Sequence, residues 1–165
     1  MAELKDVVAY LCCNYPHKEE LSKARLTKMV YLADWRSALT RGRQLTSISW
    51  VFNHYGPYVE DIISLAREDQ DFEVLRQRTQ FGDVKEVVSV RRQLPCKSLS
   101  NDDIQVLDFV ISSTKAKFWD AFIRLVYSTY PIVSQPRYGV LDLVSLAREY
   151  REAVEIGRKG EASGA

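Results

Sequence analysis

The stretch that decides the fold reads Leu26-Thr27-Lys28-Met29-Val30-Tyr31-Leu32-Ala33-Asp34-Trp35. Its apolar residues recur at helical spacing and predict one buried helix face. Ser22 has the side chain of a helix N-cap, and Gly42 suits the left-handed residue that often ends a helix. We therefore expect a long helix between these two residues, followed by a loop that leads into the next element.

The segments on either side of this helix show the periods of further helices and strands. Helical periodicity predicts helices from Leu4 to Cys12, from Pro57 to about Glu68, from a Ser100 cap to about Ser113, from Phe118 to before Pro131, and from Leu141 to before Gly157. β-branched and aromatic runs predict a strand over 46–54 and a hairpin made of Phe72–Thr79 and Val84–Val90. In the helix that contains it, Phe118 is assigned to the buried face.

These elements predict a mainly α fold of about six helices with a short strand and a two-stranded hairpin. Residues 1–156 are expected to form a single helical domain, because 165 residues suffice for one hydrophobic core. Residues 157–165 are rich in Gly, Ser, Ala and charge, so we expect a flexible C-terminal tail there.

The composition narrows the function classes. The chain has 23 Lys plus Arg against 22 Asp plus Glu, so it has no large net charge to attract nucleic acid or anionic lipid. Charges interrupt every apolar run, and no membrane span of about 20 residues is expected. The odd number of cysteines, with Cys12 and Cys13 adjacent, fits reduced thiols, and we expect a cytoplasmic protein.

Motifs for catalysis, cofactors or metals do not emerge from the sequence. Neither His17 nor His54 lies at metal-site spacing from a cysteine, and no nucleophile elbow or phosphate-binding glycine loop is present. We expect no enzyme activity, no cofactor and no metal. The remaining catalytic alternative is an unfamiliar site assembled from Asp34, His54 and Tyr55, which requires these side chains to converge in one pocket.

The aromatic cluster from Trp50 to Tyr58 is the strongest candidate for recognition. Aromatic side chains with polar tips bury a large area with little loss of conformational entropy, which favours them at binding surfaces. The alternative is that Trp50 and Phe52 belong to the core and that Gly56-Pro57 turns the chain into a helix. That alternative still leaves His54 and Tyr58 as a recognition edge.

Three segments, in their order and spacing, resemble the Panacea family, which includes the SocA-like antitoxins: residues 26–35, Gly42-Arg43-Gln44-Leu45-Thr46, and His54-Tyr55-Gly56-Pro57-Tyr58. Gln44 stands where the family often has proline. The resemblance implies a prokaryotic or phage antitoxin without enzyme activity, whose partner is a cognate toxin protein usually encoded beside it. The partner-binding or family-signature residues that it implies are Lys28, Tyr31, Asp34, Trp35, His54, Tyr55, Gly56, Pro57 and Tyr58.

Three modes of action remain open. The first is direct binding and neutralisation of the toxin, and the second is delivery of the toxin to a protease, with the tail after Gly157 as a tether. The third is a winged-helix-like nucleic-acid binder, favoured by a hairpin that carries basic residues and opposed by interspersed acidic ones. Those basic residues are Arg76, Arg78, Lys85, Arg91 and Arg92.

Overall fold

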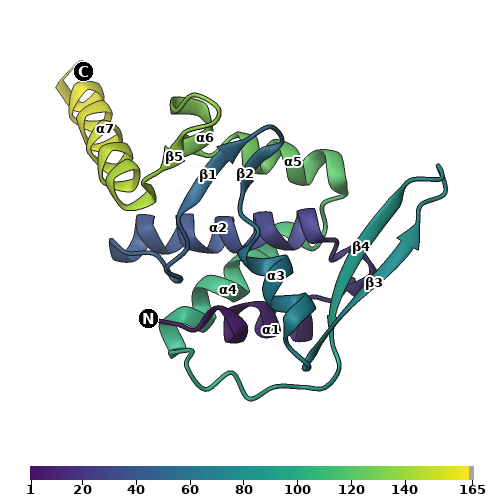
Figure 1. Cartoon of the computed structure of the whole chain (residues 1–165). Helices are drawn as coiled ribbons and strands as arrows, with labels where there is room; N and C mark the ends of the chain where they lie inside the picture. The colour runs from purple at the N-terminus through teal and green to yellow at the C-terminus, as the bar shows by residue number, and fades with distance from the viewer. Residues whose placement is uncertain (164–165) are drawn as a thin grey trace.

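Helix α2 lies at the centre of the molecule, and the other elements pack around it (Figure 1). The computed structural model describes residues 1–163. The elements of this part of the chain are α1 (Leu4–Asn14), the 3-10 turn η1 (Lys18–Glu20), α2 (Lys23–Arg41), β1 (Trp50–Asn53), β2 (Gly56–Tyr58), α3 (Asp61–Glu68), β3 (Phe72–Arg78), β4 (Val84–Val90), α4 (Asn101–Thr114), α5 (Trp119–Tyr127), α6 (Tyr130–Ser134), β5 (Val140–Leu141) and α7 (Leu143–Ser163).

The two ends of α2 are those predicted from the sequence. The Ser22 side chain accepts a hydrogen bond from the Arg25 amide, and Gly42 ends the helix with a φ of +72°. Most of the helix is buried, including the charged residues Arg25, Lys28 and Asp34. Because a buried charge is unfavourable without partners, each of these three side chains requires compensating contacts or a functional reason for its burial.

The expected fold class, mainly α with small β elements, is confirmed: 54% of the chain is helical and 15% is strand. The described residues contain seven α-helices, one more than expected, because the segment after α5 forms the short helix α6. Pro131 lies in the first turn of α6, where proline needs no amide hydrogen bond.

The predicted helix start at Pro57 is wrong. Gly56–Tyr58 forms strand β2, which pairs antiparallel with β1, and helix α3 begins only at Asp61. Strand β2 is an edge of the three-stranded sheet β2-β1-β5, a place where proline is tolerated because no ladder bond is required from its nitrogen. The residues His54 and Tyr55 therefore form the turn of a small hairpin.

Two other predicted boundaries also differ. Only Trp50–Asn53 of the expected strand over 46–54 is extended in a sheet, because the preceding loop is bonded to α2 instead. The last helix continues through Gly157 to Ser163, since the residues in this stretch are largely good helix formers. The segment expected to be a flexible tail overlaps this helix over 157–163, and its final two residues lie outside the described part of the chain.

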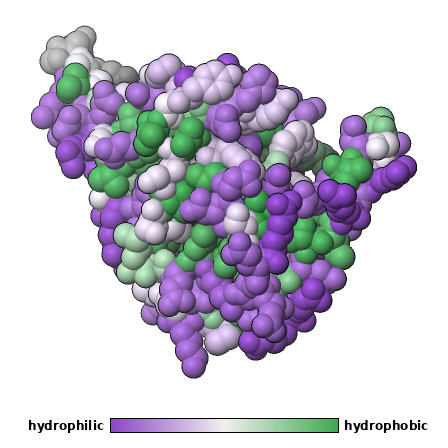
Figure 2. Space-filling view, in the orientation of Figure 1, coloured by the Kyte–Doolittle hydropathy of each residue, from purple (hydrophilic) through white to green (hydrophobic). Residues whose placement is uncertain are grey.

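The β3-β4 hairpin projects from the body as an arm (Figure 1). Its base packs on α1 and α3, while its outer half, beyond Val74 and Val87, is mostly exposed. Figure 2 shows the arm standing away from the body, with apolar side chains along it. A hollow lies between the arm and the body, and it is described below as the hairpin groove.

Candidate functional site

The predicted site residues divide into a buried set on α2 and an exposed set on the β1-β2 turn. Lys28, Tyr31, Asp34 and Trp35 are all buried on α2. Gly56 and Pro57 are also buried, Tyr58 is half-buried, and His54 and Tyr55 are exposed. Helix α2 and strand β2 are in contact, so the structure brings both sets into one region.

Asp34 anchors the loop between α2 and β1. One carboxylate oxygen accepts a hydrogen bond from the Thr46 amide at 2.8 Å. The other accepts from the Thr46 hydroxyl at 2.6 Å, from the Trp50 indole at 2.8 Å and from the Gln44 amide at 3.3 Å. Burial raises the pKa of Asp34 to about 6, while these donors favour the charged carboxylate. This residue fixes the loop and has no free acceptor facing solvent.

Tyr31 and Trp35 hold the later helices against α2. The Tyr31 hydroxyl lies 2.8 Å from the Thr129 hydroxyl, and its ring meets the Trp50 ring edge-on at 5.6 Å. Trp35 meets Tyr150 of α7 edge-on at 6.3 Å. These contacts are typical of a packed core, so both aromatic residues serve the fold.

Lys28 is the exception among the buried signature residues. Its side chain is 3% exposed, and none of the described residues forms a hydrogen bond or ion pair with its ammonium group. Burial lowers the pKa of Lys28 to about 8. A Cβ placed on Gly56 would lie 3.6 Å from Lys28 Cε and 3.5 Å from the Tyr127 ring, so the lysine stem fills the space beneath this glycine.

The β1-β2 turn carries the exposed part of the predicted site. Tyr55 is 76% exposed, and its ring contacts His54 at 4.5 Å. His54 Nδ1 lies 3.2 Å from the hydroxyl of Tyr138, an exposed residue that the sequence had not indicated. The Tyr58 hydroxyl donates to Glu60 at 2.9 Å, and burial with that carboxylate raises the pKa of Tyr58 to about 12.

Asp34, His54 and Tyr55 do not converge in one pocket, as the catalytic alternative requires. Asp34 is fully buried and bonded to Thr46, Trp50 and Gln44, whereas His54 and Tyr55 point into solvent on the turn. In residues 1–163 no group of three or more His, Cys, Asp or Glu side chains is placed to hold a metal ion. None of the helices described is long and apolar enough to cross a membrane.

A second candidate surface, which we call the hairpin groove, was not predicted from the sequence. It has a volume of about 880 Å³ and lies between the arm, the start of α2 and the start of α5. Phe81 on the arm and Phe118 before α5 are each 82% exposed, and Trp119 is 45% exposed. The assignment of Phe118 to a buried face is wrong, because it is the N-cap residue of α5 and precedes the helical face.

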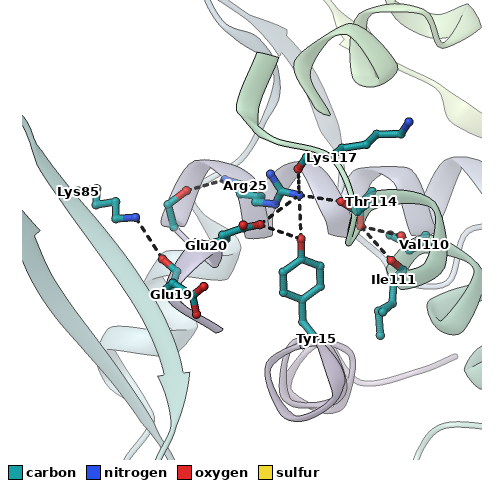
Figure 3. A network of polar contacts seen from close by, with 10 residues as sticks. Tyr15, Glu19, Glu20, Arg25, Lys85, Val110, Ile111, Thr114 and Lys117 are labelled. Atoms are coloured by element: carbon teal, nitrogen blue, oxygen red, sulfur yellow. Dashed lines mark hydrogen bonds and ion pairs between the residues drawn. The ribbon is translucent and has the colours of Figure 1, made fainter. Parts of the chain in front are cut away.

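Arg25 is one of the residues that line the hairpin groove, and it lies at the centre of a network of polar contacts (Figure 3). Its Nη2 lies 2.7 Å from the Tyr15 hydroxyl, 2.9 Å from the Thr114 carbonyl and 2.8 Å from the Lys117 carbonyl, and these three acceptors share its two hydrogens. The Nε of Arg25 is buried without a hydrogen-bond partner among the described residues. The guanidinium also lies 4.4 Å from the centre of the Phe122 ring. One buried side chain thus joins α1, α2 and the α4-α5 connection.

Three of the five basic residues of the arm form hydrogen bonds with other residues. Lys85 donates to the Glu19 carbonyl, Arg91 to the Phe72 carbonyl and Arg92 to the Asp71 carboxylate. Arg76 and Arg78 have no hydrogen bond or ion pair with any described residue. The basic hairpin therefore leaves two cations unpaired, both near the arm's outer end.

This architecture defines a class of protein: a small, mainly helical domain with buried polar and aromatic residues on its central helix and exposed aromatic side chains on the β1-β2 turn. The chain belongs to the antitoxin SocA-like, Panacea domain family, whose family model matches residues 26–131. The match runs from α2 to the start of α6 and includes every predicted signature residue. Comparison with curated proteins and with solved structures finds no match.

Proposed function

We propose that this protein is a cytoplasmic antitoxin that binds a cognate toxin protein and neutralises it without enzymatic chemistry. The observation that supports this most directly is the division of the signature residues. Asp34, Tyr31 and Trp35 fix the fold, and the same scaffold presents the exposed His54-Tyr55 turn. Exposed aromatic side chains on a rigid support are suited to protein recognition.

The test is a growth assay with the product of the neighbouring gene. Expression of that product alone should arrest growth, and co-expression of the antitoxin should restore it. A purified complex of the two proteins should also form. Absence of both rescue and complex, with the antitoxin folded and present, contradicts the proposal.

Variants of the turn test whether its exposed residues contact the toxin. His54→Ala and Tyr55→Ala should weaken the complex, because each removes a ring that is exposed and free to contact a partner. Val133→Ala is a matched control, since Val133 is exposed on α6 and lies apart from the turn in the chain. Equal rescue by all three variants would place the toxin contact elsewhere.

An antitoxin can also act by delivering the toxin to a protease, which is the alternative to direct inhibition. Deleting residues 158–165 removes the last part of the chain, of which residues 158–160 are exposed on α7, so the fold should be retained. A direct inhibitor keeps its activity after this deletion and leaves toxin turnover unchanged. An adaptor that uses this segment loses toxin turnover, which a chase experiment measures.

A further inference from the structure

The hairpin groove combines exposed apolar rings with a small excess of positive charge. Phe81, Phe118 and Trp119 provide the apolar surface. Monomeric proteins seldom expose several large aromatic side chains around one hollow, and such surfaces mark interaction sites. Its volume of about 880 Å³ falls within the range of about 300–1,000 Å³ that is usual for ligand-binding clefts.

The charges that line the groove favour an acidic occupant. Lys23, Arg76 and Lys85 have no carboxylate within 4.0 Å among the described residues. Of the acidic residues in the lining, Glu20 lies 3.7 Å from Arg25, and Glu86 is paired with Arg67 at 2.8 Å. Asp83 has no cationic partner within the described chain, and Glu86 also interacts electrostatically with Lys23 and with Arg76, which faces it across the hairpin. Four cationic residues (Lys23, Arg25, Arg76 and Lys85) against three acidic ones (Glu20, Asp83 and Glu86) leave the lining with a net charge of +1.

The start of α5 adds donors at the same place. Phe118 is the N-cap residue, but its side chain makes no capping hydrogen bond. The first amides of a helix lack partners inside the helix and favour negative charge. A carboxylate that enters the groove beside Trp119 can therefore accept from backbone amides and lie close to the lysine and arginine side chains.

We propose that the hairpin groove binds a short apolar segment of a partner protein that carries acidic side chains. Apolar residues of this segment cover Phe81, Phe118 and Trp119, and its carboxylates face Lys23, Arg76 and Lys85. This inference rests on the proposed function for the identity of the partner, a toxin, but the surface chemistry is independent of it. The groove is distinct from the β1-β2 turn and enlarges the contact surface beyond the signature residues.

A peptide selection tests the chemistry without knowledge of the partner. Random peptides of about 15 residues, long enough to begin forming a stable helix, are panned against the full-length protein. Enriched peptides should combine apolar residues with Asp or Glu. Phe81→Ser and Phe118→Ser should each weaken their binding about tenfold or more. Both residues are highly exposed, so these variants should fold normally, which circular dichroism checks.

Matched control variants distinguish binding in the groove from nonspecific binding to other exposed side chains. Val133→Ser removes an equally apolar exposed side chain outside the groove and should leave affinity unchanged. Lys23→Glu with Arg76→Glu should weaken acidic peptides about tenfold or more, whereas Lys97→Glu with Arg158→Glu should not. Enrichment of basic peptides, no enrichment at all, or equal binding by groove and control variants would overturn the inference.

The growth assay then distinguishes the two proposals. If wild-type protein rescues growth and Phe118→Ser with Phe81→Ser rescues equally well, the antitoxin function stands and the groove is not the toxin site. If wild-type protein gives no rescue, the antitoxin function falls, and peptide selection alone decides whether the groove binds acidic apolar segments.

Discussion

The indole nitrogen of Trp50 donates a 2.8 Å hydrogen bond to the buried carboxylate of Asp34. This bond joins the first residue of β1 to the middle of α2, across the loop that Thr46 also ties to Asp34. No cation takes part, so neutral donors alone stabilise the carboxylate.

Replacement of Asp34 tests this network. Asp34→Asn keeps the shape but turns an acceptor into a donor that faces the Thr46 and Trp50 donors. We expect a loss of about 2–3 kcal/mol in the free energy of unfolding at neutral pH, measured by denaturant titration. Asp102→Asn, at an exposed position in the first turn of α4, is the control and should change stability far less. Equal effects of the two variants would contradict the role of Asp34.

The pH dependence of stability provides a second test of Asp34. Its pKa in the folded protein is about 6, above the ordinary value of 3.8. The folded state therefore holds this proton more strongly, and its stabilising contribution is complete below about pH 4 and lost as the pH rises through 6. The stability difference between wild type and Asp34→Asn should fall by roughly 2 kcal/mol over this range. A difference that grows with pH would exclude this assignment.

Lys28 should lower the free energy of unfolding, because its ammonium group has no hydrogen-bond acceptor among the described residues. Lys28→Met keeps the apolar stem beneath Gly56 and removes an ammonium group that is largely shielded from solvent and has no hydrogen-bond or ion-pair partner among the described residues. We expect a gain of about 1–3 kcal/mol at pH 7. Since the folded pKa is lowered to about 8, the unfolded chain binds more protons above that pH, and wild-type stability should rise between about pH 8 and 10.5. This rise should be absent from Lys28→Met, and Lys115→Met, at an exposed site, should retain it.

Gly56 is required by both its backbone conformation and its surroundings. Its φ is +103°, and an added Cβ would lie 3.5 Å from the Tyr127 ring. Gly56→Ala should lower the free energy of unfolding by about 1–3 kcal/mol, mainly through backbone strain. Gly157→Ala is the opposite case, because this helical glycine has open space around it. That variant should be neutral or gain up to about 1 kcal/mol. A similar loss in both would refute the conformational argument.

Arg25 joins three parts of the chain through one planar group. Arg25→Lys retains the charge but is shorter, so its ammonium group does not reach the position where Nη2 meets Tyr15, Thr114 and Lys117. It also loses the planar group that lies over the Phe122 ring. We expect destabilisation of about 2–4 kcal/mol by thermal and denaturant unfolding. Arg124→Lys on the exposed side of α5 should have little effect. Unchanged stability in Arg25→Lys would show that the network contributes little.

Much of the fold follows from local signals. Ser22 and Gly42 bound α2, and the predicted Ser100 cap begins α4, where it forms a capping box with Asp103. Each of these depends on side-chain and backbone chemistry within a few residues, which a sequence states directly. The β3-β4 hairpin follows for the same reason, since both strands and the turn are contiguous.

The errors arise where distant segments decide the structure. Gly56-Pro57 suits a helix start locally, but Phe52 and Asn53 pair with these residues and make them a strand. Phe118 matches a helical apolar stripe, yet it precedes α5 and stays exposed beside the arm. The hairpin groove brings together residues from three separate parts of the chain, so no local pattern could indicate it.

By itself, the sequence determined the central helix with its caps, the mainly helical class and the family, because these depend on contiguous residues and fixed spacings. Only the tertiary structure decided which polar residues are buried with partners, as Asp34 is, and which are buried without them, as Lys28 is. It also decided which aromatic rings face solvent. Burial depends on what packs against each face of an element, and most of those neighbours lie far away along the chain.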